Sequence, residues 1–313
     1  MTEAITVPTE RGVLTIKRDQ PMSLHTTFRI GGPADFLTRA GSEPELLAAI
    51  DWAERHDLPV TVIGGGSNLL VGDRGIRGLV ILARTPGSAL DGHVDLAVEG
   101  ERARLTVPAQ APISWLGHYT ASRGWAGLEW AAGLPGVVGG AVVNNAGAHG
   151  GEMADHLTSV ELLDLAERRV SRWSREQLQA RYRYTVLKVE PRPRRWVVLR
   201  ATFELPPGER EELTARAASY AQWRRQAQPT GACAGSVFTN PPGTYAGYLI
   251  EQAGLKGRQV GGVRVSELHG NFFINTGNAT AADVRALIAL IQEEVFRRFG
   301  IELVPEIEEI GEA

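Results

Sequence analysis

The sequence predicts a mixed α and β protein of two or three domains. Its 313 residues exceed the usual size of a single domain and are enough to bury a sizeable core. Near the N-terminus, a capped amphipathic helix is followed by a strand that ends in a glycine loop, which indicates a β-α-β-like unit. The residue pattern changes near positions 86 and 206, so we expect three consecutive parts.

The helices and strands are expected from periodicity and from the residues that flank them. In the first part, residues 42–58 have helical spacing, with Ser42 and Glu45 in the positions of a capping box. Residues 59–66 form the strand that reaches the glycine loop. In the second part, short strands are expected at 104–107, 160–165 and 195–205. The segment 133–152 is so dense in glycine that we expect it to form core poorly.

The third part is expected to contain three helices and three strands. The helices are predicted at 209–228, 245–254 and 281–299, and the strands near 261–266, 271–277 and 301–311. Thr280 and Gly300 are the expected caps of the last helix. One apolar stripe runs along that helix, formed by Val284, Leu287, Ile288, Ile291, Val295 and Phe299.

The composition excludes some classes of function. Hydrophobic residues make up 43% of the chain, charged residues 22%, and the formal net charge is −3, so nothing in the charge favours nucleic acid or an anionic membrane as a partner. The single cysteine, Cys233, cannot form an internal disulfide or a thiolate metal site. No signal-peptide pattern is present, and no run approaches about 18 apolar residues. We therefore expect a cytoplasmic protein without a membrane span.

Three glycine loops lie in the first half, at 28–35, 64–70 and 133–151. One such loop alone is usually a turn, but backbone N–H groups in glycine loops can also approach an anion closely. Neither the P-loop pattern nor Gly-x-Gly-x-x-Gly occurs. Three loops, the last with Asn144 and Asn145, indicate a long ligand with a pyrophosphate. A dinucleotide fits, and FAD in a fold other than the Rossmann fold is the remaining candidate.

Three side chains are candidates for chemistry. Arg183 stands among aromatic residues in "YRYT", although a solvated arginine fits equally. Ser236 lacks the neighbours that activate a nucleophile, so we interpret it as a hydrogen-bond donor, a proton donor or a residue without a chemical role. Glu306 lies in an apolar strand end, where a partly buried carboxylate and a solvent-exposed one are both possible. The histidines show no metal-ligand spacing, so no metal is expected.

Seven motifs occur in an order that resembles the UDP-N-acetylenolpyruvoylglucosamine reductases, the MurB family. They are "HTTFRIGGPADF", "IGGGSNLLVGD", "GLEWAAGLPGVVGGAVVNNAGAHGGE", "YRYT", "AGSVFTNP", "LIEQAGLKGRQVGGVRVSELHGNFFIN" and "LVPEIEEIG". Each motif is weak alone, but seven in order over about residues 21–309 are specific. The chain resembles the shorter, type II-like branch, because no tyrosine-bearing insertion follows "YRYT".

The resemblance implies an α+β fold with FAD bound in the manner of the vanillyl-alcohol-oxidase (PCMH) type. It assigns 1–85 to a first FAD-binding subdomain completed by the C-terminal strand 301–313, 86–205 to a second subdomain, and 206–300 to a substrate-binding domain. The implied activity is that of a UDP-N-acetylmuramate dehydrogenase in peptidoglycan precursor synthesis. NADPH is the co-substrate, FAD is the cofactor, and UDP-N-acetylglucosamine enolpyruvate is reduced to UDP-N-acetylmuramate. A monomer that binds only small molecules is expected.

The resemblance also implies roles for individual residues. Arg183 and Glu306 would stabilise an enolate-like intermediate, and Ser236 would donate the proton. The implied FAD-binding residues are Arg29, Gly31, Gly64, Gly65, Gly66, Ser67, Asn68, Leu69, Gly133, Pro135, Gly139, Gly140, Ala141, Asn144 and Gly147. The implied substrate-binding residues are Tyr182, Asn240, Lys256, His269 and Asn271.

The chain departs from the family pattern at two positions. Thr185 stands where many relatives have serine, and Thr239 replaces the lysine of the common "FKNP". Lys256 is the expected substitute for that positive charge. Two other functions are compatible with the sequence: an FAD-dependent sugar or alcohol oxidase of the same fold, and a non-catalytic nucleotide-sugar-binding protein.

Overall fold

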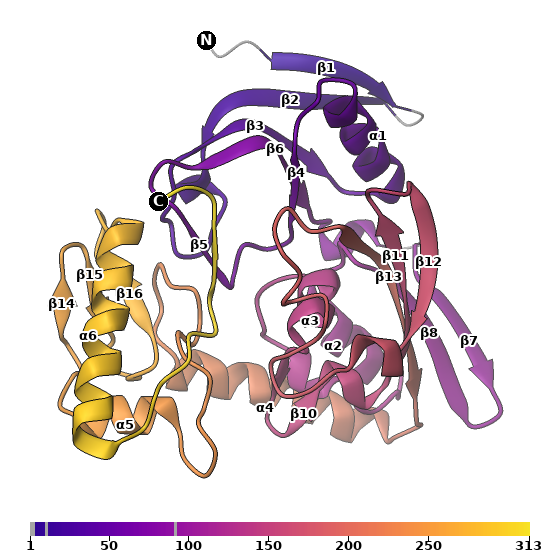
Figure 1. The fold of residues 1–313 in the computed structure, drawn as a ribbon. Coiled ribbons are helices and arrows are strands. Elements are labelled where there is room, and N and C mark those ends of the chain that lie inside the picture. Colours follow the sequence, from indigo (N-terminus) through magenta and orange to yellow (C-terminus); the bar gives the residue numbers. More distant parts are fainter. Residues whose placement is uncertain (1–3, 10–11, 91–92) are drawn as a thin grey trace.

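The computed structural model describes residues 4–9, 12–90 and 93–313. The first part of the chain forms a five-stranded sheet in the order β1-β2-β3-β6-β4 (Figure 1). The N-terminal strands pair antiparallel, whereas β3, β6 and β4 run parallel. The bounds are β1 (Ala4–Thr9), β2 (Gly12–Pro21), β3 (Pro33–Ala40), β4 (Val60–Ile63) and β6 (Ile76–Ala83). A short 3-10 helix, Met22–Leu24, follows β2.

Helix α1 (Glu43–Glu54) covers one face of this sheet. The expected capping box is present, because the Ser42 hydroxyl accepts from the Glu45 N–H and the Glu45 carboxylate accepts from the Ser42 N–H. Leu46 and Ile50, one helical turn apart, are buried against the sheet. Strand β4 then leads directly into the glycine loop, as the sequence predicted.

The second part contains an antiparallel sheet in the order β12-β11-β13-β8-β7. Its strands are β7 (Asp95–Glu99), β8 (Arg102–Pro108), β11 (Leu157–Asp164), β12 (Arg169–Ser174) and β13 (Trp196–Leu205). Helices α2 (Ile113–Ala121) and α3 (Val138–Asn144) pack on it, with the short strands β9 (Gly147–Ala148) and β10 (Gly151–Glu152). Four 3-10 helices complete this part: Gly87–Ala89, Glu129–Ala131, Met153–Asp155 and Glu176–Leu178.

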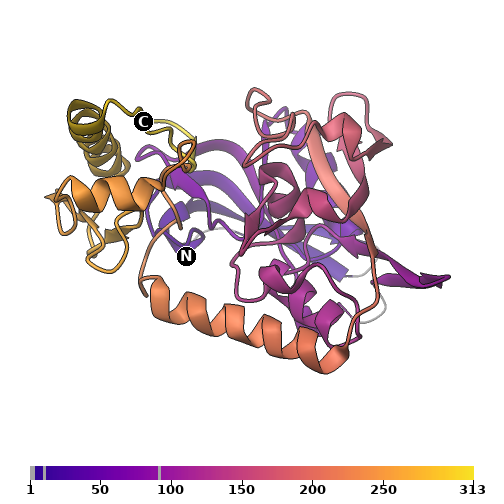
Figure 2. The ribbon, with the colours of Figure 1, turned by 90° about the horizontal axis from the view of Figure 1, so that it is seen from below.

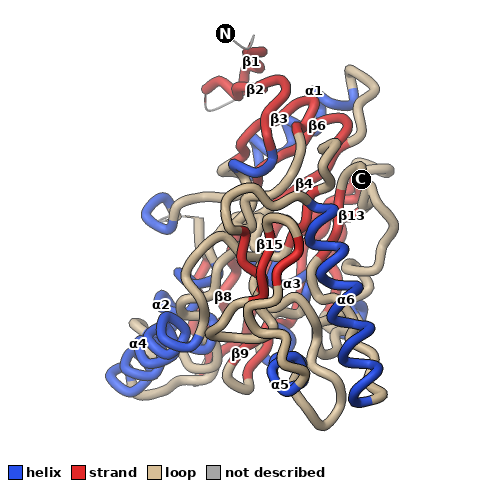
Figure 3. Tube along the Cα trace, turned by 90° about the vertical axis from the view of Figure 1, so that its left-hand side faces the viewer, coloured by secondary structure: helices blue, strands red, loops and turns tan. Residues whose placement is uncertain are grey.

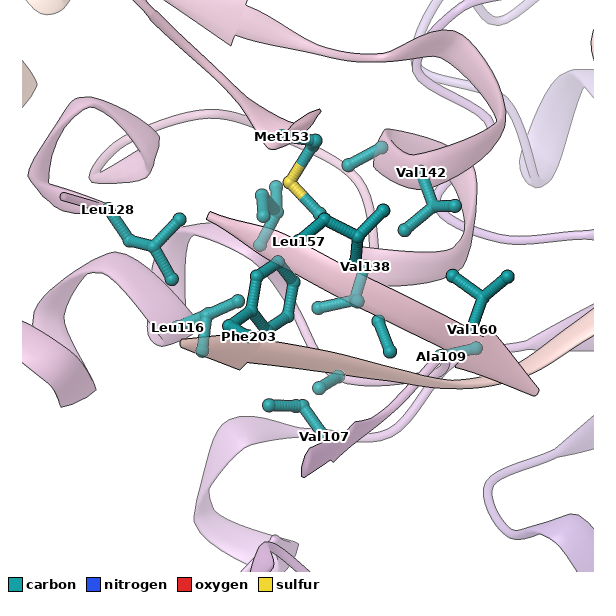
Figure 4. Packing of buried hydrophobic residues seen from close by; sticks show 14 of the residues in the cluster. Val107, Ala109, Leu116, Leu128, Val138, Val142, Met153, Leu157, Val160 and Phe203 are labelled. Atoms are coloured by element: carbon teal, nitrogen blue, oxygen red, sulfur yellow. The ribbon is translucent and has the colours of Figure 1, made fainter. Parts of the chain in front are cut away.

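The structure corrects the expectation that the glycine-dense segment 133–152 forms core poorly. The segment contains α3, whose Val138 and Val142 are buried with Phe203 and Met153 in the core of the second part (Figure 4). The physical reason is that Val138, Ala141 and Val142, at positions i, i+3 and i+4, share one buried face of a short helix, while Gly140 faces the cavity.

The third part is a small antiparallel sheet with two helices, joined by long loops (Figure 3). Its elements are α5 (Ala246–Gln252), β14 (Gln259–Val260), β15 (Val263–Val265), β16 (Phe273–Asn275) and α6 (Ala281–Phe299). Thr280 forms a capping box and Gly300 ends α6 in a left-handed conformation, as expected. Phe299 departs from the expected buried stripe, because this last residue of the helix is 38% exposed.

Helix α4 (Arg210–Ala227) runs along the underside of the molecule toward the third part (Figure 2). The sequence analysis grouped this helix with the third part. Its buried residues Leu213, Ala217 and Ala221 instead pack against Ala121 of α2 and Ala132 of the second part.

The chain returns to the first part at its C-terminal end. There β17 (Glu308–Ile310) pairs parallel with β5 (Leu69–Val71). The strand expected at 301–311 is thus only three residues long. The preceding residues form isolated contacts with the third part: Pro305 lies opposite Phe238, and the Glu306 N–H donates to the Val237 carbonyl (2.7 Å). None of the helices in the described ranges has the length and apolarity needed to cross a bilayer.

Candidate active site

A cavity of about 560 Å³ lies where the three parts meet. Its wall is formed by the glycine loop after β4, by α3, by the start of β13, and by two segments from the end of the chain, at 234–236 and 306–308. This volume is within the range of about 300–1,000 Å³ typical of ligand pockets. Most of the residues expected to bind FAD, together with Arg183, Ser236 and Glu306, line this one cavity.

The glycine loop offers hydrogen-bond donors to the cavity. The backbone N–H groups of Gly65, Gly66, Ser67 and Asn68 donate no hydrogen bond to any residue that the structure describes. Consecutive free N–H groups in a glycine-rich turn form an anion-binding concavity. The loop therefore fits the pyrophosphate of a dinucleotide.

The glycines of this loop are required by the protein itself. A Cβ on Gly64 would lie 2.4 Å from Val137 Cγ2, one on Gly65 would lie 2.6 Å from Gly136 Cα, and one on Gly66 would lie 2.6 Å from the His25 carbonyl oxygen. Gly66 also has a positive φ of 64°. The loop is thus pressed against the segment that precedes α3, and its free N–H groups are held in place by that packing.

Two other glycines leave open space in the cavity wall. Nothing lies within 4 Å of a Cβ placed on Gly140 or on Gly235, and both residues line the cavity. A side chain at either position would fill space that a bound molecule could otherwise use. These positions, with the free amides of the loop, fit a long ligand such as FAD.

Arg183 and Glu306 form an ion pair in the cavity wall. Arg183 Nε lies 2.9 Å from Glu306 Oε1, and the two side chains are 19% and 17% exposed. Arg183 Nη2 also donates to the Gly147 carbonyl (2.6 Å), so the guanidinium is held from both sides. Burial raises the pKa of Glu306, while Arg183 and then Lys188 act in the opposite direction. The site therefore combines a fixed cation with a carboxyl group that holds its proton more strongly than usual.

Ser236 lies beside this pair. The backbone of its segment forms an isolated bridge with Phe272 and accepts, at Val237, the hydrogen bond from Glu306 N–H. The Ser236 hydroxyl forms no hydrogen bond with another described residue, although it lines the cavity. It is therefore available to a bound molecule.

Asn68 connects the parts of the site. Its side-chain amide donates to Asn144 Oδ1 (3.3 Å) and to the Glu306 carbonyl (3.2 Å). One residue of the glycine loop thus contacts both α3 and the C-terminal segment, which fixes these elements relative to one another.

Comparison with known proteins agrees with this geometry. Residues 34–172 match an FAD binding domain family, and residues 227–310 match the C-terminal domain of UDP-N-acetylenolpyruvoylglucosamine reductase. A reductase of that name from Rubrobacter xylanophilus is 45% identical over 298 residues, which is 95% of both chains. One from Bacillus velezensis is 40% identical and covers 96% of both chains.

The chain belongs to the UDP-N-acetylenolpyruvoylglucosamine reductase family. The crystal structure of the reductase from Thermus caldophilus superimposes on it with a TM-score of 0.74 at 33% identity and covers 99% of both chains. The predicted FAD-binding fold of the vanillyl-alcohol-oxidase type is confirmed by these matches. The flavoprotein assignment is confirmed with it.

Several residues assigned by resemblance to the reductases lie outside the cavity wall. Gly31 packs against Val71, and Gly133 packs against Ala221 of α4. Arg29 is exposed, and its carbonyl accepts from the Asn275 side chain. Lys256 pairs with Glu251 (3.0 Å).

Two of the expected substrate-binding residues of the reductase site, Asn271 and Tyr182, contact the segment after Ser236. The Asn271 amide is buried and bonds both backbone groups of Phe238, which fixes that segment. His269 Nδ1 accepts from the Asn271 N–H (3.1 Å). The Tyr182 hydroxyl lies 3.5 Å from the Asn240 N–H, and Asn240 is the member of this group that lines the cavity.

Other charged and aromatic residues of the site were not found from the sequence. Arg224 lines the cavity and forms no ion pair with a described carboxylate. His149 stacks on Tyr220 of α4 at 4.1 Å, and Trp223 of the same helix is half exposed. The run "YAQWRRQ" of α4, which places two aromatic residues close to two arginines, is the signal that could have indicated them.

Proposed function

We propose that the protein uses NADPH and FAD to reduce UDP-N-acetylglucosamine enolpyruvate to UDP-N-acetylmuramate, a step of peptidoglycan precursor synthesis. One observation carries this proposal: the free amides of the glycine loop, the Arg183–Glu306 pair and the free Ser236 hydroxyl face one cavity. Relatives with 40–45% identity over nearly the whole chain bear the name of this reductase.

The first two parts are proposed to hold FAD. The amides of residues 65–68 would bind the pyrophosphate, and the open wall at Gly140 would accommodate the remainder of the molecule. When bound and reduced by NADPH, FAD supplies the hydride for the reaction. The third part, with Asn240, is proposed to bind the substrate.

Arg183 is proposed to stabilise negative charge on the substrate. Addition of a hydride to the methylene carbon of the enolpyruvyl group leaves an electron pair on the adjacent carbon, and this charge spreads into the substrate carboxylate. A guanidinium held by Glu306 and the Gly147 carbonyl has no need to reorganise as that charge develops. Preorganised charge of this kind is often the largest contribution to catalysis.

Glu306 is proposed to act in its protonated form. An ionised carboxylate next to the developing negative charge would oppose the reaction, whereas a protonated carboxyl group can donate a hydrogen bond to it. The raised pKa of Glu306, which results from burial, favours this form. We expect the protonation of Glu306 to limit the reaction on its alkaline side.

Ser236 is proposed to give its proton to the carbon that carries the electron pair. Serine is a weak acid, but a carbanion is basic enough to accept its proton. This completes the addition of one hydride and one proton across the double bond. The free hydroxyl of Ser236, on a segment tied to Glu306 through Val237, supports this role.

Arg224 is proposed to replace Lys256 as the cation for the substrate diphosphate. Lys256 is held by Glu251 away from the cavity, whereas Arg224 lines the cavity and forms no ion pair with a described residue. Because burial lowers the pKa of Arg224, an anion at this position would be favourable. The missing lysine at Thr239 is thus compensated from helix α4.

The test begins with the visible spectrum of the purified protein, which should show a flavin that acid precipitation releases. Without oxygen, NADPH oxidation should then depend on the enolpyruvyl substrate, and the product should carry two additional hydrogens by mass spectrometry. Oxygen consumption with a sugar or alcohol would instead indicate an oxidase, and a colourless protein would indicate a binding protein. A cytoplasmic monomer is part of the proposal, and its mass in solution can be measured by light scattering.

A further inference from the structure

Lys188 is a partly buried lysine that the mechanism above does not use. It lies five residues after Arg183, and its Nζ donates to the Arg183 carbonyl (3.1 Å). The Lys188 N–H donates to the Thr185 carbonyl (3.1 Å), so the same turn returns the side chain toward Arg183. Lys188 therefore acts on the residue that carries the positive charge of the site.

Arg183 needs such a contact because its backbone is strained. Its φ is +55°, in the left-handed region that residues other than glycine rarely adopt. Reciprocal backbone hydrogen bonds between Arg181 and Tyr184 close the turn on either side of it. The ammonium group of Lys188 donates a hydrogen bond to the Arg183 carbonyl.

A neutral donor could make the same hydrogen bond, so the charge of Lys188 requires a separate reason. Among the described residues, Lys188 forms no ion pair, unlike Lys256 with Glu251. Burial lowers the pKa of Lys188, and the nearby carboxylates of Glu306 and Glu308 partly offset this effect. The charged groups that face the Lys188–Glu306 region are Arg183, Arg192, Arg194 and Glu308.

We propose that Lys188 is a positioning residue of the reductase site: its Nζ holds the Arg183 carbonyl (3.1 Å), and its positive charge acts on the Arg183–Glu306 pair, whose side chains lie 2.9 Å apart. This inference rests on the proposed function for its effect on turnover. Its effect on Glu306 itself is independent of turnover. Without the ammonium, Glu306 would keep its proton to higher pH, because a nearby positive charge favours the ionised carboxylate.

The direct test is a carbon-13 NMR titration of protein labelled at the glutamate carboxyl groups, with Glu306→Gln used to assign the signal. Lys188→Met should move the titration midpoint of Glu306 to higher pH, because one nearby positive charge is lost. Lys188→Gln, which keeps a donor but no charge, should shift it similarly. Lys188→Arg, which keeps the charge, and Lys17→Met, at an exposed position on β2, should leave it near the wild-type value.

Turnover supplies a second readout. The alkaline limit of the substrate-dependent reaction should move in the same direction as the NMR midpoint, and Lys188→Gln should retain more activity than Lys188→Met. An unchanged midpoint in folded Lys188→Met or Lys188→Gln protein would overturn the proposal and leave Lys188 a structural residue only. If the midpoint moves but no variant or wild type reduces the enolpyruvyl substrate, the proposed function fails while the effect of Lys188 on Glu306 stands.

Discussion

Glu306 and Glu308 lie two residues apart on one extended segment, and both line the cavity, yet the structure holds them differently. Glu308 is bound by two arginines: its Oε2 contacts Arg192 and lies 2.6 Å from Arg194 Nη2. Glu306 has one arginine and a pKa raised by burial. The two carboxylates differ in direct contact with cations: two guanidinium groups bind Glu308, whereas Arg183 binds Glu306 and Lys188 lies nearby without forming an ion pair with it.

The backbone hydrogen bonds of Glu306 and Glu308 also differ. Glu308 is the first residue of β17, and its N–H donates to the Asn68 carbonyl. Its backbone is therefore held by the pairing between β17 and the first part of the chain. Glu306 precedes the strand and is tied to the segment that contains Ser236. We therefore expect substitutions on the Glu306 side to change the reaction and substitutions on the Glu308 side to change stability.

The largest effect is expected at Ser236. Ser236→Ala should bleach its flavin with NADPH at nearly the wild-type rate, whereas the substrate-dependent half-reaction should slow by about 10²–10⁴-fold, the usual contribution of a positioned proton donor. Stopped-flow recovery of flavin absorbance without oxygen measures that half-reaction. Ser236→Cys should recover part of the rate, and Cys233→Ala should change little. Unchanged recovery in Ser236→Ala would show that another group donates the proton.

Glu308→Gln should destabilise the fold. It leaves Arg192 and Arg194 without their carboxylate, and because both guanidinium groups are partly exposed we expect a loss of about 1–3 kcal/mol rather than the larger cost of a fully buried pair. Chemical denaturation at matched flavin content measures this change. Glu309→Gln is the matched control, since its pair with Arg285 is at the surface and should contribute at most about 1 kcal/mol. Equal losses of unfolding free energy in Glu308→Gln and Glu309→Gln would contradict the expectation that the pairs of Glu308 stabilise the fold more than the surface pair of Glu309.

Glu306→Gln should change the pH dependence of stability. Because the pKa of Glu306 is raised in the folded protein, the folded state holds this proton more strongly than the unfolded chain. The associated stability is present below the ordinary glutamate pKa and is lost as the pH rises through the folded pKa. The thermal midpoint of Glu306→Gln relative to wild type should therefore increase with pH over that window, with about 1.4 kcal/mol for each unit of pKa difference. A difference that stays constant or decreases with pH would contradict the raised pKa.

Gly140→Ala is expected to have the smallest effect on stability and to separate folding from cofactor binding. A methyl group at this position meets nothing within 4 Å, so alanine in α3 should stabilise the flavin-free protein by up to about 1 kcal/mol. The same methyl group occupies cavity space, so FAD affinity should fall. Thermal unfolding of the flavin-free protein and fluorescence titration with FAD measure the two effects. Unchanged FAD affinity would indicate that the cofactor does not reach this wall.

Gly65→Val is unsuitable for the same purpose. A side chain on Gly65 would strike the backbone of Gly136, so a loss of flavin in that variant would report disturbed packing between the loop and α3. Gly140 differs because its free space belongs to the cavity. The comparison of the two glycines shows why a sequence motif alone does not identify which atoms face the ligand.

Local features were determined by the sequence itself. The ends of α1 and α6 follow from Ser42 with Glu45 and from Thr280 with Gly300, because capping bonds join residues only a few positions apart. The seven motifs also carried the family, the cofactor class and the candidates Arg183, Ser236 and Glu306. Such signals depend on neighbouring residues, so they can be recognised without knowing the fold.

The tertiary structure alone decided how those residues are used. It paired Arg183 with Glu306, placed Arg224 in the cavity wall while Lys256 pairs with Glu251, reduced the last strand to three residues, and brought the Lys188 ammonium to the Arg183 carbonyl. The Arg183–Glu306 pair and the pairing of β17 with β5 join segments distant in the chain, whereas the contacts of Lys188 and Lys256 depend on how the local turn folds. The proton affinity of a carboxyl group and the accessibility of a cation are set by burial and by such neighbours, which the spacing of residues along a sequence does not contain.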